Sequence, residues 1–234
     1  MSEQETAPKA DATFTHTLLI ELDYVAVSLR PVEFEAIKRG IEPKGIELTP
    51  AAFCRSPLSP DHRTAVTDIL KAAGNKADAI EKAVGEVNKS VTAFCANESE
   101  PNTAITKLVK AAQARGVAVF AYSALNATDS SALLTRLGLD ELGVELILPE
   151  EQRETFPRAD DWLKMLKQVA IENKTVVAVV SSQLACKGAL TAGAAVIAVP
   201  DQYTSFQDFS GAAFVLDQLS DEKPDQLLDH TLRM

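Results

Sequence analysis

The chain has 234 residues, 46% hydrophobic and only 6% aromatic, with 33 acidic against 23 basic side chains and a formal net charge of −10. That length can bury a substantial core and fits one medium domain with room for a small insert. The acidic balance excludes a surface built by default for the phosphate backbone of nucleic acid, and no window reaches the roughly 20 apolar residues of a membrane span.

Short apolar runs predict the strands of the fold. They follow a polar segment, residues 1–14, that we expect to be a disordered tail. Five runs are His16–Asp23, Val117–Tyr122, Val144–Leu148, Thr175–Val180 and Ala195–Val199, and a shorter sixth is Ala213–Leu216. Continuous apolar runs are typical of strands buried on both faces of a parallel sheet, so we expect five or six such strands.

Helical spacing fills the gaps between the later strands. The predicted helices are Ala104–Arg115, Ser130–Leu137, Asp160–Asn173 and Ala185–Ala192. Three of them are followed at once by a glycine, which is the expected stop signal. Strands that alternate with helices indicate an α/β protein with a Rossmann-like parallel sheet, in which ligands bind at the carboxyl ends of the strands.

Residues 29–97 contain no run of strand type and four helical patterns instead. These are Val32–Arg39, Thr49–Cys54, Asp61–Ala73 and Lys76–Phe94. Such a segment predicts a small all-helical cap inserted after the first strand. The expected division is therefore a core from 15–28 and 98–220, a helical cap from 29–97, and a C-terminal tail from 221–234.

Four segments, in chain order, resemble the motifs of the haloacid dehalogenase superfamily. Leu18-Leu-Ile-Glu-Leu-Asp-Tyr-Val25 resembles the first, an apolar strand ending Asp-x-Asp-Gly-Thr/Val, and Ala121-Tyr-Ser123 resembles the second, a strand ending in Ser or Thr. Phe156-Pro-Arg-Ala-Asp-Asp-Trp-Leu163 is similar to the third, Lys-Pro-x-Pro-Asp-x-x-Leu, and the segment from Val180 to Gly193 is similar to the fourth. Their order, their spacing and the helical insert resemble the branch that contains phosphoglycolate phosphatases and β-phosphoglucomutases.

The resemblance implies a role for each matched position. In the superfamily, the first aspartate attacks phosphorus, the second protonates the leaving group, acids of the fourth motif help to hold Mg²⁺, and a lysine and a hydroxyl hold the phosphoryl oxygens. Carried over by position, the catalytic residues are Glu21 and Asp23, the phosphate- or ligand-binding residues are Ser123, Ala124, Phe156 and Ser182, and the metal positions are Val180 and Ser181.

The departures from the pattern predict that metal-dependent phosphoryl transfer has been lost. Phe156 brings no charge to the phosphoryl oxygens, and Val180 with Ser181 brings no carboxylate to Mg²⁺, which favours anionic oxygens. Glu21 carries an extra methylene, and a displacement of about 1 Å can lower a rate by about 10²-fold. The expected protein is a pseudoenzyme with a vestigial site, no confident metal ligand and no cofactor.

Two alternatives stay open. One is an active phosphomonoester hydrolase or phosphomutase that uses Glu21 as nucleophile and Mg²⁺, with metal ligands from Asp160 or Asp161 and phosphate ligands from Lys164 or Lys187. The other is an unrelated chemistry. Against replacement ligands, acidic residues in a first helical turn complement the helix dipole without any metal, and serines at strand ends commonly satisfy backbone groups.

If catalysis is lost, the cleft under the cap predicts binding instead. A small anionic metabolite and a second copy of the chain are the expected partners, without nucleic acid or membrane. The contact candidates in the cap are Phe53-Cys54 and Ala93-Phe94-Cys95. The polar N-terminus lacks the pattern of a secretory signal, so we expect the protein to be cytoplasmic.

Overall fold

Six parallel strands form one sheet in the part of the chain that the structure describes. The computed structural model describes residues 16–55, 62–100, 102–149, 156–169 and 175–233, so the predicted tail 1–14 lies outside the described residues. The strands are β1 (His16–Glu21), β2 (Val117–Tyr122), β3 (Glu145–Ile147), β4 (Val176–Val180), β5 (Ala195–Ala198) and β6 (Phe214–Val215). Their spatial order is β3-β2-β1-β4-β5-β6, which confirms the predicted Rossmann-like α/β sheet.

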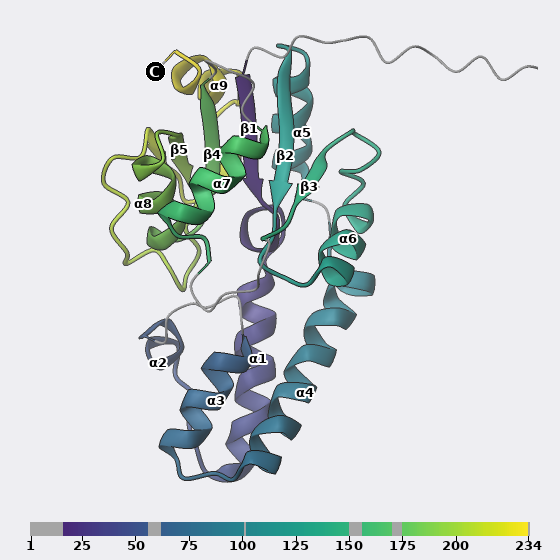
Figure 1. Cartoon of the computed structure of the whole chain (residues 1–234), viewed down its shortest axis with the longest axis vertical. Helices are drawn as coiled ribbons and strands as arrows, with labels where there is room; N and C mark the ends of the chain where they lie inside the picture. The colour runs from purple at the N-terminus through teal and green to yellow at the C-terminus, as the bar shows by residue number, and fades with distance from the viewer. Residues whose placement is uncertain (1–15, 56–61, 101, 150–155, 170–174, 234) are drawn as a thin grey trace, which may run out of the picture.

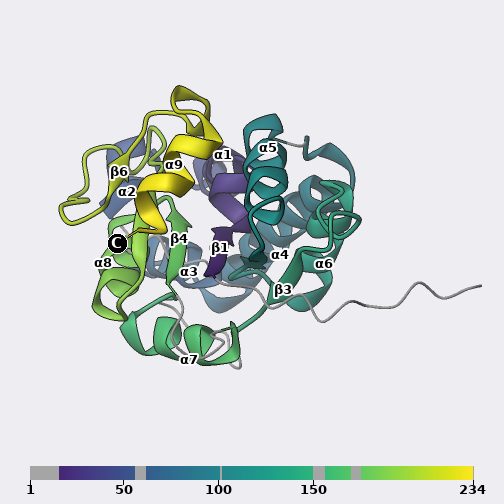
Figure 2. The same ribbon diagram turned by 90° about the horizontal axis from the view of Figure 1, so that it is seen from above.

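Alternate residues of β1 belong to two separate apolar layers, one on each face of the sheet (Figure 2). Leu18 and Ile20 pack toward the first layer and Leu19 toward the second. The first layer contains α5 (Thr103–Gln113), α6 (Ala127–Arg136) and α9 (Pro224–Thr231), and the second contains α7 (Ala159–Val169) and α8 (Gln183–Thr191). Helices on both faces explain why the strands are apolar throughout rather than alternating.

Four of the helices between β1 and β2 extend beyond the carboxyl ends of the strands (Figure 1). They are α1 (Leu29–Ile41), α2 (Pro50–Arg55), α3 (His62–Ala72) and α4 (Ala77–Ala93), called the helical insert below. Their apolar stripes pack on one another, with Ile37, Leu70 and Val87 buried. None of the helices in the described ranges is long and apolar enough to cross a membrane.

Two segments differ from the sequence-based expectation. The first strand ends at Glu21 rather than Asp23, because Leu22–Ala26 turns into a π-helix. The segment 221–234, expected as a tail, contains α9, whose Leu227 and Leu228 are fully buried. Arg115 at the end of α5 also pairs with Asp225 and Asp229 of α9, each at 2.8 Å, so this segment belongs to the core.

The close packing of α8 on α7 supplies a test of the second apolar layer. A Cβ atom at Gly188 would lie 2.6 Å from Cδ1 of the buried Trp162, so Gly188→Ala overpacks the layer. We expect it to lower the free energy of unfolding, measured in urea, by about 1–3 kcal/mol. Gly85→Ala in α4 is the matched control: a Cβ there meets nothing within 4 Å, and the same change should stabilise by about 0.5–1 kcal/mol. Equal effects of the two substitutions would contradict this packing.

Candidate functional site

The polar residues of the site gather where the strand order changes direction. The chain adds β2 and β3 on one side of β1 and β4 to β6 on the other, which places a topological switch point between β1 and β4. Glu21 ends β1, Ser181 follows β4, and Asp201 lies in the loop after β5. The carboxyl ends of strands at a switch point form the usual ligand crevice of such sheets. In this chain, α1 brings Arg30 to the same point.

A continuous hydrogen-bonded network joins these four side chains. The backbone N–H and the hydroxyl of Ser181 both donate to Oε2 of Glu21, each at 2.6 Å. The Nη2 group of Arg30 donates to the Ser181 hydroxyl at 2.7 Å, and its Nη1 group donates to Oδ2 of Asp201 at 2.8 Å. One guanidinium therefore connects an acid from β1 with an acid from the loop after β5. We call Glu21, Arg30, Ser181 and Asp201 the arginine network.

The surroundings of Arg30 stabilise its positive charge. Its guanidinium carbon lies 3.9 Å from the ring centroid of Tyr24, a cation–π contact. Burial opposes ionisation of Arg30, but the carboxylates of Glu21 and Asp201 raise its pKa above the ordinary value. Burial also raises the pKa of Glu21, while the guanidinium and the two donors of Ser181 counteract that shift. The network is thus a buried ion cluster with one cation and two acids.

Asp23 lies in a second network that contains no cation. Its Oδ1 accepts from the Ser123 hydroxyl at 2.6 Å and its Oδ2 accepts from the Ala124 backbone N–H at 2.8 Å. Ser123 in turn is 2.7 Å from the Ser130 hydroxyl, which lies 3.2 Å from the backbone oxygen of Leu125. Burial raises the pKa of Asp23 to about 7; the two donors lower it, and the nearby Glu21 and Glu33 carboxylates raise it further.

The hydroxyl chain satisfies Asp23 in either protonation state. When Asp23 is ionised, Ser123 donates to it and Ser130 donates to Ser123. When Asp23 is protonated, its own O–H can donate to Ser123, which then turns to Ser130, which turns to the Leu125 carbonyl. Because both arrangements use every hydroxyl hydrogen, this network accommodates a neutral carboxylic acid at a position with 1% exposure.

Phe156, which occupies the lysine position of the resemblance, lies in an aromatic cluster. It is buried and packs edge-on against Tyr122 with ring centroids 6.2 Å apart, and Tyr122 meets Trp162 at 5.1 Å. Ser182 serves as the N-cap of α8, where its hydroxyl accepts from the Ala185 N–H. Phe156 therefore has the contacts of a core side chain, and Ser182 has the contact of a helix N-cap.

The replacement ligands considered from the sequence have structural contacts of their own. Asp161 accepts from the backbone N–H of Arg158 at 2.9 Å in the first turn of α7. Lys187 pairs with Asp208 at 2.9 Å and donates to Ser210. Neither contact belongs to the arginine network.

The residues at the site do not fit a divalent metal ion. Oε2 of Glu21 already accepts two hydrogen bonds, Val180 is apolar, and a guanidinium lies between the two acids. Across the described ranges, no group of three or more His, Cys, Asp or Glu side chains could hold a metal. Mg²⁺ needs several oxygen ligands in near-octahedral geometry, and here the Arg30 guanidinium occupies the space beside Ser181 and Asp201.

Arg30 and Asp201 were missed by the sequence analysis. A signal for Arg30 existed: it stands at the N-terminal end of the buried stripe of α1 that continues with Phe34, Ile37 and Ile41. A charged residue on an apolar stripe is rarely buried without a partner. Asp201 lies three residues after the buried strand β5, at its carboxyl end, where ligand-binding side chains of such sheets are expected.

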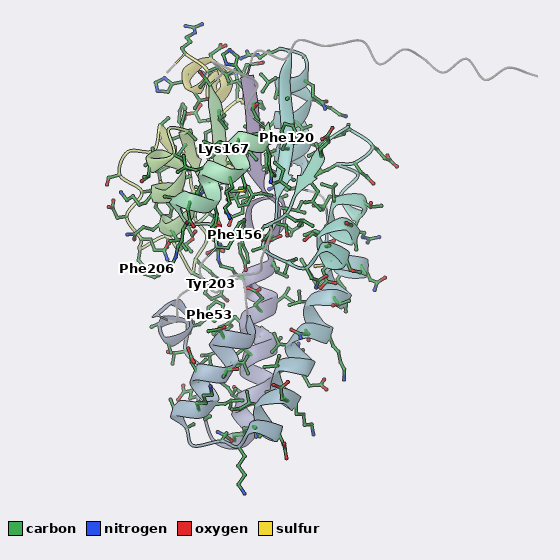
Figure 3. The ribbon with its side chains drawn as sticks, in the orientation of Figure 1. Phe53, Phe120, Phe156, Lys167, Tyr203 and Phe206 are labelled. Carbon is green, nitrogen blue, oxygen red and sulfur yellow. The ribbon has the colours of Figure 1, made fainter. Side chains whose placement is uncertain are left out.

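Aromatic rings close the junction between the helical insert and the core beside this network. Phe34 of α1 and Phe53 of α2 lie 5.4 Å apart, and Tyr203 of the core loop lies 5.6 and 5.2 Å from them. Phe53 and Tyr203 are side by side between the two parts in Figure 3. The loop after β5 therefore supplies both Asp201 and Tyr203 to the junction.

Solved structures with a similar fold include haloacid dehalogenase family hydrolases, a predicted phosphoglycolate phosphatase and a β-phosphoglucomutase. CbbY from Rhodobacter sphaeroides in complex with phosphate has a TM-score of 0.69 and 16% identity, covering 89% of this chain and 96% of that one. A predicted phosphoglycolate phosphatase from Haemophilus somnus has a TM-score of 0.67 and 16% identity, covering 89% of this chain and 96% of that one. β-Phosphoglucomutase from Clostridium difficile has a TM-score of 0.71 and 13% identity, covering 92% of this chain and 96% of that one.

The chain has the haloacid dehalogenase-like fold, in the form seen in phosphoglycolate phosphatase and β-phosphoglucomutase. The resemblance inferred from the four motifs is confirmed at this level. No protein-family model and no curated protein matches the sequence.

The raised pKa of Asp23 predicts a pH-dependent stability. Between about pH 4 and 7 the folded protein retains a proton that the unfolded chain releases, so stability should fall as pH rises through this window and then level off. Asp23→Asn should remove this pH-dependent change in the free energy of unfolding, about 4 kcal/mol over the whole window. The reason is that its amide can donate to Ser123 and accept from Ala124 as the neutral acid does. Urea titrations across pH measure the slope.

Asp225→Asn is the control for this experiment, since it also removes one carboxylate, but from an ion pair in which the Asp225 side chain is 71% exposed. It should change the slope little. A slope that is the same in wild type and Asp23→Asn would show that Asp23 keeps an ordinary acidity in the folded protein.

Proposed function

We propose that this haloacid dehalogenase-like protein has lost metal-dependent phosphoryl transfer and acts by binding. The observation that carries the proposal is the position of the Arg30 guanidinium, 2.7 Å from Ser181 and 2.8 Å from Asp201, at the carboxyl ends of the central strands. Positive charge in this place is committed to the protein's own acids rather than to a phosphoryl group.

The chemistry of phosphoryl transfer supports the same conclusion. The transition state spreads charge over the phosphoryl oxygens, and catalysis rests on cations that neutralise it and on a correctly placed nucleophile. Glu21 accepts two short hydrogen bonds from Ser181, and Phe156 is packed against Tyr122. Neither the nucleophile position nor the lysine position of the resemblance is equipped for its implied role.

One observation favours the alternative of an active phosphomonoester hydrolase or phosphomutase. The pKa of Asp23 is raised to about 7, which suits a general acid working near neutral pH. In that alternative Glu21 is the nucleophile, and Mg²⁺ is the cofactor. The two functions differ in whether turnover depends on Glu21.

Turnover of a panel of small phosphomonoesters, with and without Mg²⁺, tests the proposal. We expect wild type to show no Mg²⁺-dependent rate above that of Glu21→Ala, with near-ultraviolet circular dichroism confirming that both proteins are folded. Mg²⁺-dependent turnover that disappears in Glu21→Ala would overturn the proposal and make Glu21 the nucleophile.

Binding of a small anionic metabolite predicts a saturable rise of the thermal midpoint. Phosphomonoesters and inorganic phosphate are the probes, because a ligand that binds only the folded state stabilises it by mass action. An unchanged thermal midpoint, together with a sedimentation coefficient that rises with protein concentration, would contradict a metabolite as the partner. It would indicate a second copy of the chain instead.

A further inference from the structure

Arg30 is the cation of the arginine network: it contacts Asp201 directly and reaches Glu21 through the Ser181 hydroxyl. It is 1% exposed, and its two Nη groups point in different directions, toward Ser181 and Asp201. Asp201 keeps its other oxygen, Oδ1, for the Tyr203 N–H at 2.9 Å and the Thr204 hydroxyl at 3.1 Å. The oxygens of the network thus come from three separate segments of the core: Ser181 and Asp201 accept from Arg30, and Glu21 accepts from Ser181.

These oxygens resemble a cation site in their chemistry. Carboxylate and hydroxyl oxygens that converge from several segments are ligands for a hard divalent cation when nothing else occupies the space between them. Here a guanidinium occupies that space. We infer that Arg30 is the resident cation of this site, that it excludes divalent metal ions from Glu21 and Asp201, and that removing its side chain creates a divalent-cation site. The inference rests on the site of the proposed function.

Two properties of Arg30 exclude metal ions from the site: its permanent positive charge and the contacts that hold its side chain in place. A guanidinium cannot be deprotonated in proteins, so a metal ion can approach Glu21 and Asp201 only against a permanent positive charge or by displacing the side chain. Displacement is opposed by the Tyr24 ring 3.9 Å away and by the anchoring of α1, whose Ile37 and Ile41 are buried in the insert. The guanidinium offsets one of the two carboxylate charges, which weakens the attraction of Glu21 and Asp201 for a second cation.

Mn²⁺ titrations of wild type and Arg30→Ala test this inference. The concentration of free Mn²⁺, measured by electron paramagnetic resonance, should fall when Arg30→Ala is added. Wild type should lower it only by the small amount that exposed carboxylates bind. The thermal midpoint of Arg30→Ala should rise by roughly 5–10 °C when Mn²⁺ is about 100-fold above its dissociation constant. Arg30→Lys, which keeps a positive charge, should show neither response.

The triple variant Arg30→Ala, Glu21→Gln, Asp201→Asn is the matched control, because it opens the same space without the acids. It should lose both Mn²⁺ responses. A folded Arg30→Ala variant that binds no more Mn²⁺ than this control would overturn the inference.

A measurement on wild type holds even where Arg30→Ala does not fold. Mn²⁺ binding by wild type that is lost in Glu21→Gln would overturn the inference, and no difference between these two proteins is expected. The outcome is separable from the proposed function. Turnover without Mn²⁺ binding would overturn only the function, and Mn²⁺ binding without turnover only the inference.

Discussion

A buried guanidinium between two acids is the interaction on which the site of this protein depends. Removing charges from water is costly, and removing one partner of a buried pair typically costs about 3–5 kcal/mol because the other charge remains uncompensated. Arg30 meets this requirement with Asp201, the Ser181 hydroxyl and the ring of Tyr24. Since each partner comes from a different segment, the network forms only when the insert, β4 and the loop after β5 are all in place.

The two acids at the end of β1 differ in what surrounds them. Both are buried, and burial raises the pKa of each. Glu21 has a cation two hydrogen bonds away, through Ser181, whereas Asp23 has only the neutral donors of Ser123 and Ala124. The π-helix at Leu22–Ala26 produces this separation by turning Asp23 away from the strand direction. Two carboxylates two residues apart therefore occupy electrostatically different environments.

The fold could be predicted from periodicity, while the arginine network could not. Apolar runs such as Val117–Tyr122 are set by burial on both faces, and Gly116, with a φ of 69°, forms the turn between the end of α5 and this strand. The ordered motifs also predicted that Glu21, Asp23 and Ser123 lie at or just after strand ends; β1 ends at Glu21, β2 ends at Tyr122, and parallel pairing brings these two ends together. Arg30 and Asp201 are 171 residues apart in the chain, and no local pattern links them. Short elements such as the π-helix and α9 likewise depend on tertiary contacts rather than on propensity.

The same residues that fill the crevice also hold the insert against the core. Arg30 and Phe34 are one helical turn apart on α1; the first binds Asp201 and the second packs on Tyr203, two residues further along the same loop. Phe53 of α2 contacts both rings. Separating the insert from the core would break an ion pair and an aromatic cluster at once, whereas an active site under a mobile insert must exchange substrate and product through that junction. The contacts that offset the charges of Glu21 and Asp201 therefore also oppose separation of the insert from the core.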